Sequence, residues 1–206
     1  RAAGSINLDA PVEENVRNVA RALEKKVEDI VAILLDRPRH EHIIKELRRL
    51  GVRVKLISDG DVSAAIATAV DWTGVDILFG IGGAPEGVLA AAALKCLGGE
   101  IQGRLVPDDE HDRERIKEMG LQDPEQLLLM QDFIKGDDII FAATGITDGD
   151  LLQGVRYAGN RATTHSVVMR GLTGTIRFIR ATHRLDLKPH FVARECSVTH
   201  KTPRFS

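Results

Sequence analysis

Two arginines flank a proline directly after a short apolar run, in the segment Arg37-Pro38-Arg39. Proline stiffens this loop, so it presents the two guanidinium groups with little conformational entropy left to lose. Guanidinium is also the side-chain group best shaped to grip phosphate through paired hydrogen bonds. The alternative interpretation is a pair of solvated surface arginines. Because the segment follows a predicted strand, the sequence supports both interpretations equally.

A second polar loop, Asp59-Gly60-Asp61, follows the next predicted strand. Its carboxylates could accept hydrogen bonds from sugar hydroxyls or help to hold a divalent metal. The alternative is structural: Asp61 caps a helix that begins at Val62, and Gly60 permits the turn. Capping by one aspartate leaves the other free to bind a ligand, so the two interpretations are compatible.

The most informative loop is Gly80-Ile81-Gly82-Gly83-Ala84-Pro85-Glu86-Gly87. Its glycines let the backbone approach a ligand closely, and Pro85 begins a helix whose free N–H groups favour anions. A dinucleotide fingerprint would need a third glycine at position 85, and a P-loop would need Gly-Lys-Ser/Thr, so both are excluded. Glu86 could simply complement the helix dipole. A carboxylate beside an anion site is also where a metal bridging protein and phosphate would sit, and we favour that role.

Other polar groups give weaker signals. The segment Thr144–Asp150 resembles a further ligand loop, but we favour a strand-to-helix turn capped by one of its last two aspartates. His40 and His42 lie two residues apart at a predicted helix start, and His111 lies among carboxylates. Neither group has a metal-ligand spacing, so we predict that these histidines lie on the solvated surface.

The elements that must position these loops alternate between helices and strands. A stripe of valines and Leu23 predicts a helix over 12–26, with Asp9 as its cap and Pro11 in its first turn. The other elements predicted in the first half are strands over 30–35, 52–57 and 75–79, and helices over 41–50, 62–70 and 86–97. This alternation predicts βαβ units and a largely parallel sheet, with the polar loops at the carboxyl ends of its strands.

The second half has a more mixed pattern. It predicts strands over 101–106, 138–142, 165–170 and 175–182, the last two joined as a hairpin, and charged helical residues over 107–131, broken at Gly120 and at Asp123-Pro124. No internal repeat or long linker is visible in the sequence. We therefore predict one compact unit over residues 1–187, followed by a tail, 188–206, to which we assign no structure.

Composition excludes several classes of protein. The 206 residues are 43% apolar, which predicts a folded core, and carry a formal net charge of −2. With no polybasic tract and only one Trp and one Tyr, nucleic acid is a poor partner. The longest apolar run, Val88–Leu94, is too short to span a bilayer. Cys96 and Cys196 form no disulfide framework, and we expect Cys96 to be a core residue of a cytosolic protein.

From about Gly4 to Leu187 the chain resembles the class II fructose-1,6-bisphosphatases, bacterial enzymes of the lithium-sensitive, metal-dependent phosphatase superfamily. Four segments carry the resemblance, in the order and spacing of the family: Arg37-Pro38-Arg39-His40, Ser58-Asp59-Gly60-Asp61, Gly80-Ile81-Gly82-Gly83-Ala84-Pro85-Glu86-Gly87 and Ala143-Thr144-Gly145-Ile146-Thr147. The Gly-Gly-Ala-Pro-Glu segment is specific, and the other three support it.

The resemblance implies a layered α/β/α/β/α sugar-phosphatase fold, of which this chain supplies the C-terminal part. It also implies hydrolysis of the 1-phosphate of fructose 1,6-bisphosphate to give fructose 6-phosphate, and some family members take sedoheptulose 1,7-bisphosphate. Mn²⁺ or Mg²⁺ would polarise the scissile phosphate and activate a water for in-line attack. We expect a cytoplasmic homo-oligomer, with no membrane or nucleic-acid partner, that serves gluconeogenesis or Calvin-type carbon metabolism.

Residue by residue, the resemblance implies that Glu86 is a metal ligand. The positions that match the family's substrate contacts are Arg37, Pro38, Arg39, Asp59, Gly60, Asp61 and Gly83. We infer that the arginines hold the phosphate that is not cleaved, while Asp59 and Asp61 bind sugar hydroxyls.

One departure from the family pattern concerns the rest of the site. The family places its remaining acidic metal ligands, and a substrate-binding tyrosine, upstream of the region that resembles this chain. Tyr157 is the only tyrosine here and lies in the wrong place, and the chain starts at Arg1 without a methionine. We therefore expect the C-terminal portion of the enzyme, inactive alone. The alternative is a non-catalytic sugar-phosphate-binding module that keeps the phosphate loops but lacks the metal ligands.

Overall fold

The computed structural model describes residues 2–107, 109–121, 123 and 125–188, so the tail beyond Lys188, with Cys196, and Pro124 lie outside the described residues. The elements of the first half are α1 (Val12–Ala22), η1 (Val27–Asp29), β1 (Val31–Leu35), η2 (Pro38–His40), α2 (Glu41–Arg49), β2 (Arg53–Ile57), α3 (Asp61–Ala67), η3 (Asp71–Thr73), β3 (Ile77–Leu78) and α4 (Ala84–Leu97). Those of the second half are α5 (Glu110–Glu118), α6 (Met130–Phe133), β4 (Ile140–Thr144), β5 (Arg156–Ala158), β6 (Arg161–Arg170), β7 (Thr175–Arg184) and η4 (Leu185–Leu187).

The first sheet is parallel, with strand order β2-β1-β3. Its central strand β1 is an unbroken apolar run whose alternate side chains are buried on opposite faces, as expected of a parallel strand covered on both sides. Ala32 is paired with Val54 on one side and with Ile77 on the other. Because the three strands run the same way, the loops that follow them emerge at one edge of the sheet.

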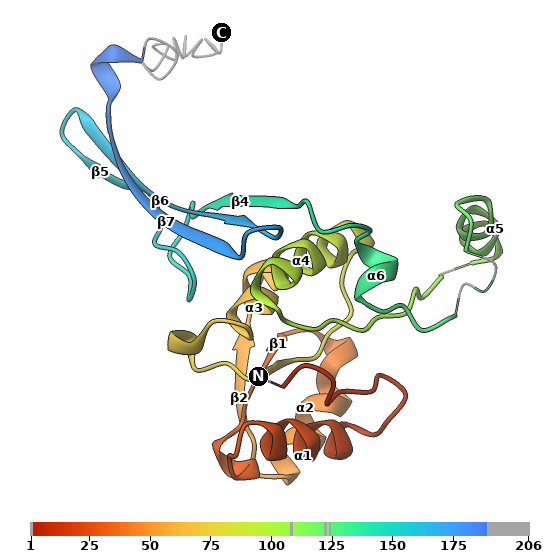
Figure 1. The fold of residues 1–206 in the computed structure, drawn as a ribbon. Coiled ribbons are helices and arrows are strands. Elements are labelled where there is room, and N and C mark those ends of the chain that lie inside the picture. Colours follow the sequence, from red (N-terminus) through yellow and green to blue (C-terminus); the bar gives the residue numbers. More distant parts are fainter. Residues whose placement is uncertain (1, 108, 122, 124, 189–206) are drawn as a thin grey trace, which may run out of the picture.

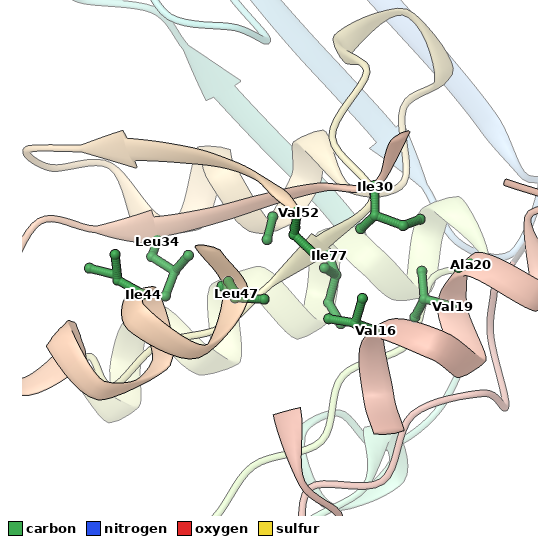
Figure 2. Close-up of a cluster of buried hydrophobic side chains, with 10 residues drawn as sticks. Val16, Val19, Ala20, Ile30, Leu34, Ile44, Leu47, Val52 and Ile77 are labelled. Atoms are coloured by element: carbon green, nitrogen blue, oxygen red, sulfur yellow. The ribbon is translucent and has the colours of Figure 1, made fainter. Parts of the chain in front are cut away.

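Helices α1 and α2 cover one face of this sheet. Figure 2 shows their apolar side chains, among them Val16, Val19 and Leu47, gathered against Leu34 and Ile77 of the strands. Val16 and Leu47 are both fully buried. The apolar stripes of the two helices therefore supply one half of the core that holds the sheet in place.

The opposite face of the sheet packs on α3 and α4, whose small residues permit a close approach. Ile33 of β1 contacts Ala64 and Ala67 of α3. The far sides of these helices then pack against a second sheet, where Ala93 and Phe141 belong to one buried cluster. The described residues thus form four successive layers, α/β/α/β, as Figure 1 shows. The predicted α/β class is confirmed.

The second sheet is antiparallel, and β6 lies at its centre. Strands β4 and β5 pair with successive parts of one edge of β6, and β7 pairs with the other edge over ten residue pairs, from Arg161↔Arg184 to Arg170↔Thr175. The predicted hairpin is confirmed. Met169 and Val167, near the hairpin turn, are fully buried, whereas the other end of the hairpin extends away from the helices (Figure 1). We call β5, β6 and β7 the arm.

Some predicted boundaries are wrong. Helix α1 ends at Ala22 instead of residue 26, and its N-cap is Pro11, with no side-chain cap. The Asp9 carboxylate instead pairs with Arg104 at 2.5 Å. This ion pair lies at the surface and contributes little stability. The absence of an aspartate cap costs the helix little, because Glu13 and Glu14 still complement its dipole.

Residues 101–106, predicted as a strand, make only an isolated bridge, between Gly103 and Leu128. Of the predicted helical stretch 107–131, only α5 and the first part of α6 are helical in the described residues, and Gly120 ends the first with a positive φ of 97°. Helix α5 has no buried residue, which explains why charge rather than an apolar stripe dominates its sequence. The sequence analysis missed β5.

Cys96 is buried among the side chains of α3, α4 and the second sheet, which confirms its predicted core role. Burial raises the pKa of its thiol. Each helix within the described ranges is too short or too polar to cross a lipid bilayer.

Candidate functional site

The Arg-Pro-Arg segment follows β1 and joins the loops after all three parallel strands. The Arg37 guanidinium donates from Nη1 to the carbonyl of Asp36 at 3.0 Å and from Nη2 to the carbonyl of Ser58, after β2, at 2.8 Å. The Arg39 guanidinium donates from Nε and Nη2 to the carbonyl of Ile81, after β3, at 3.0 and 2.7 Å. Both arginines remain exposed. They are therefore fixed by backbone carbonyls while one edge of each still faces solvent.

His40 is the residue of this segment that was mispredicted. It is completely buried, whereas His42 and His111 are exposed as expected. Its Nδ1 lies 2.8 Å from the carbonyl of Leu35 and its Nε2 accepts the backbone N–H of Ile81 at 2.9 Å. A sequence signal for burial was present, because position 40 shares a helical stripe with Ile44 and Leu47.

The Asp-Gly-Asp loop after β2 has a different geometry from the predicted cap. The N-cap of α3 is Gly60, whose φ of 88° is readily adopted only by glycine, and Asp61 is the first helical residue. Asp61 Oδ1 accepts the N–H of Val62 at 2.9 Å. Its Oδ2 lies so close to Gly82 that a Cβ there would meet it at 2.6 Å. Asp59 is exposed.

The glycine-rich loop after β3 runs into the N-terminus of α4. Gly83 is the N-cap, Pro85 lies in the first turn and Glu86 is the third helical residue. The Glu86 carboxylate folds back over Gly83 and occupies the space that a Cβ would need there. Glycine at position 83 therefore makes room for the carboxylate, which is exposed to solvent.

The structure brings some of the predicted site residues together in one cavity of about 960 Å³. Asp61, Gly83 and Glu86 line it, together with the glycines at 80 and 82. Arg37, Pro38, Arg39, Asp59 and Gly60 are not among its lining residues, although the arginines are bonded to the same loops. The predicted residues thus form one loop cluster with two parts: Asp61, Gly83 and Glu86 at a cavity whose lining is otherwise mostly apolar, and an arginine segment beside it.

The fourth segment, Thr144–Asp150, is followed by β5 and not by the predicted helix. Asp148 closes the loop on itself: it accepts the N–H of Gly154 at 2.9 Å and pairs with Arg156 at 2.6 Å. These two contacts hold the pKa of Asp148 below its ordinary value. Asp150 pairs with Lys55 of β2 at 2.5 Å, so the loop reaches the parallel sheet but supplies its carboxylates to protein partners.

The fit of a divalent metal to these residues is partial. Carboxylate oxygens are the ligands that Mg²⁺ and Mn²⁺ prefer, and Glu86 offers one that is exposed. Across the described residues, no three His, Cys, Asp or Glu side chains gather closely enough to hold a metal ion. Tyr157 lies on β5, 74% exposed, outside the loop cluster.

Taken together, the fold and the cluster define an α/β protein whose candidate ligand site is built from loops at the carboxyl edge of a parallel sheet. Glycines, arginines and carboxylates at this edge suit an anionic, hydroxyl-bearing ligand. The chain belongs to the family described as bacterial fructose-1,6-bisphosphatase, glpX-encoded, whose model matches residues 1–183. The resemblance found in the sequence is therefore confirmed.

Two curated relatives illustrate the match. The chain is 42% identical over 198 residues to the D-fructose 1,6-bisphosphatase class 2/sedoheptulose 1,7-bisphosphatase of Synechococcus sp. (strain JA-3-3Ab), covering 90% of this chain and 57% of that protein. It is 44% identical over 200 residues to fructose-1,6-bisphosphatase 1 class 2 of Escherichia coli (strain K12), covering 91% of this chain and 59% of that protein. The chain thus spans less than two thirds of the length of these relatives.

Proposed function

We propose that this chain is the C-terminal portion of a metal-dependent phosphoric monoester hydrolase that removes the 1-phosphate of fructose 1,6-bisphosphate to give fructose 6-phosphate. The family membership and the names of the relatives support the activity. The observation that carries the proposal is the hydrogen bonding of the arginine segment to the loops after β2 and β3, which gathers cation, glycine and carboxylate at one sheet edge.

In this proposal the substrate lies along the loop cluster. Within the described residues, Arg37 Nε and Arg39 Nη1 make no hydrogen bond, so each arginine keeps a donor for the phosphate that is not cleaved. Pro38 stiffens their loop. Asp59 and Asp61 accept hydrogen bonds from sugar hydroxyls, while Gly60 and Gly83 let the backbone approach the substrate closely.

Glu86 is the proposed ligand for Mn²⁺ or Mg²⁺. Bound there, the metal would polarise the scissile phosphate and make a bound water more acidic. The described residues supply one suitable carboxylate and no complete ligand set. We propose that the part of the relatives that this chain does not match holds the remaining ligands, so that neither part is active alone.

The wider setting is also proposed from the family. We propose a cytoplasmic homo-oligomer in gluconeogenesis or Calvin-type carbon metabolism, with sedoheptulose 1,7-bisphosphate as a second substrate, as the name of the Synechococcus relative suggests.

The proposed function is tested by phosphate release from fructose 1,6-bisphosphate with Mn²⁺ or Mg²⁺. The protein extended upstream to its natural start is compared with residues 1–206 alone. We expect release by the extended protein only, and release that stops when EDTA removes the metal. If the extended protein is inactive but still binds the sugar phosphate, the proposed hydrolysis is wrong and the binding module takes its place.

A further inference from the structure

The backbone of Ile81 is held through both its N–H and its C=O, which belong to two successive peptide groups, by neighbouring residues of another loop. Its N–H donates to His40 Nε2 at 2.9 Å, and its carbonyl accepts the Nε and Nη2 of Arg39 at 3.0 and 2.7 Å. Ile81 lies between two glycines, whose backbone would otherwise be free to adopt many conformations. The segment after β1 thus restrains the most flexible part of the loop after β3.

The chemistry of its partners fixes the state of the His40 ring. A carbonyl can only accept, so Nδ1 must carry a proton and donate to Leu35. A backbone N–H can only donate, so Nε2 must offer a lone pair to Ile81. The ring is therefore the neutral tautomer with its proton on Nδ1. Only this form makes both bonds, since a ring with both nitrogens protonated has no acceptor for Ile81.

Burial makes these two bonds consequential. His40 is fully buried, and Gly80 lies against its ring: a Cβ added to Gly80 would lie 3.9 Å from Cε1 of the ring. A buried donor or acceptor that loses its partner destabilises the folded state by the full free energy of its desolvation, because no hydrogen bond replaces the lost water. If the loop after β3 moved away from His40, the Nε2 lone pair of this buried ring would lose its partner.

We propose that His40, with Arg39, is a positioning residue that holds the backbone of Ile81 and thereby sets the position of the glycine-rich loop that leads to Gly83 and Glu86. The proposal rests on the proposed function in so far as that loop contacts substrate and metal. His40 itself does not touch substrate and acts through the backbone. The alternative is that the buried ring serves stability alone. In that case its contribution would depend equally on both of its hydrogen bonds.

Two substitutions separate the two bonds. The amide of His40→Gln reaches about as far as Nε2, so its oxygen can accept from Ile81 while the bond to Leu35 is lost. The shorter amide of His40→Asn reaches about as far as Nδ1, so it can donate to Leu35 while the bond to Ile81 is lost. The matched controls are His42→Gln and His42→Asn, because His42 is an exposed histidine two residues away.

In the protein extended to its natural start, we expect His40→Asn to lower kcat/KM by about 10- to 100-fold, as loss of groups that orient ligands does. His40→Gln should stay within about threefold of wild type, as should both His42 controls. Thermal unfolding is measured alongside. Equal losses of kcat/KM in the two His40 variants, or losses that follow their melting temperatures, would show a purely structural role and overturn the proposal.

A second readout does not depend on activity. Hydrogen–deuterium exchange of the Ile81 amide should be at least about tenfold faster in His40→Asn than in wild type, and nearly unchanged in His40→Gln. Nitrogen NMR of histidine-labelled protein should show a protonated Nδ1 and an unprotonated Nε2 in wild type. The other tautomer in wild type, or an exchange rate of the Ile81 amide that is unchanged in His40→Asn, would refute the proposed positioning role of His40. If the wild type hydrolyses no sugar phosphate yet shows these signals, the proposed function is wrong, but the hold of His40 on the backbone of Ile81 is confirmed.

Discussion

The loops at the carboxyl edge of the parallel sheet and the antiparallel arm hold their arginines in different ways. In the loops after β1, β2 and β3, arginine and histidine side chains bond to backbone groups of neighbouring loops, as Arg39 and His40 do to Ile81. Elsewhere this half also has surface ion pairs, such as Arg53 with Asp29 at 2.7 Å. In the arm, arginines meet carboxylates at the surface, as with Arg156 on Asp148 and Arg184 on Asp186. Hydrogen bonds from one loop to the backbone of another fix the relative positions of the loops, whereas surface ion pairs contribute little stability.

Charge and burial follow the same division. From Leu151 to Arg184 the sequence contains six arginines and no aspartate or glutamate. Strand β1 buries its three middle residues, but β7 has no buried residue. The candidate ligand loops thus lie on a sheet covered on both faces, while the arm is secured at its turn end. The following changes test that division, from the largest expected effect to the smallest.

In the protein extended upstream to its natural start, Glu86→Gln should abolish metal-dependent phosphate release. We expect the rate of release to fall at least about a hundredfold. The amide is a far weaker metal ligand than the carboxylate, and because Glu86 is exposed the fold should be unchanged. Glu110→Gln is the matched control, an exposed first-turn glutamate on α5. Full activity in Glu86→Gln would refute the metal assignment.

Met169→Ala should lower the free energy of unfolding by about 2–5 kcal/mol, because it removes a fully buried side chain from the base of the arm. Ile179→Ala, on the exposed strand β7, should cost less than about 1 kcal/mol. Chemical denaturation followed by circular dichroism measures both. Similar costs for the two changes would mean that the arm is not anchored at its turn end.

Arg39→Ala should raise the Michaelis constant for fructose 1,6-bisphosphate by about tenfold, equivalent to about 1.4 kcal/mol of binding. It removes both a donor for phosphate and the grip on the Ile81 carbonyl. Arg48→Ala, an exposed arginine on α2, serves as the control. Steady-state kinetics that leave the Michaelis constant of Arg39→Ala unchanged would count against the phosphate role.

Asp148→Asn should have the smallest effect, and one that depends on pH. Gly154 and Arg156 hold the pKa of Asp148 below its ordinary value of 3.8, so the ionised form stabilises the folded state. That stabilisation is complete above the unfolded pKa and is lost as pH falls through the lower folded pKa. Melting temperatures of wild type and variant should therefore differ near pH 7 and converge at low pH. A gap that persists at low pH would contradict this origin.

The sequence predicted the parallel half well because its signals are local. The strand over 30–35 is an apolar run, and the strand over 52–57 alternates apolar with basic residues in its first part. Gly51 and Gly98 end helices with positive φ as expected. The three ligand loops follow from the rule for parallel sheets. By contrast, β5 is a three-residue exposed strand that exists only because β6 pairs with it, and no local pattern marks it.

Within the loop cluster, residue types were predictable but their partners were not. Arg39 was expected to hold phosphate, yet its fork also grips the Ile81 carbonyl, 42 residues along the chain. His40 was expected at the surface because its spacing from His42 suits no metal site, and the helical stripe it shares with Ile44 and Leu47 was overlooked. Asp61 was expected to cap α3, but the left-handed conformation of Gly60 places the cap one residue earlier. Such contacts depend on tertiary packing.

The division between a candidate ligand half and a supporting arm is tested most directly by hydrogen–deuterium exchange with saturating fructose 6-phosphate, the product of the proposed reaction. In the naturally started protein, we expect slower exchange in residues 36–40, 58–61 and 80–86, and no change in residues 156–184. Protection of the arm, or unchanged exchange in all three loops at saturation, would contradict the account.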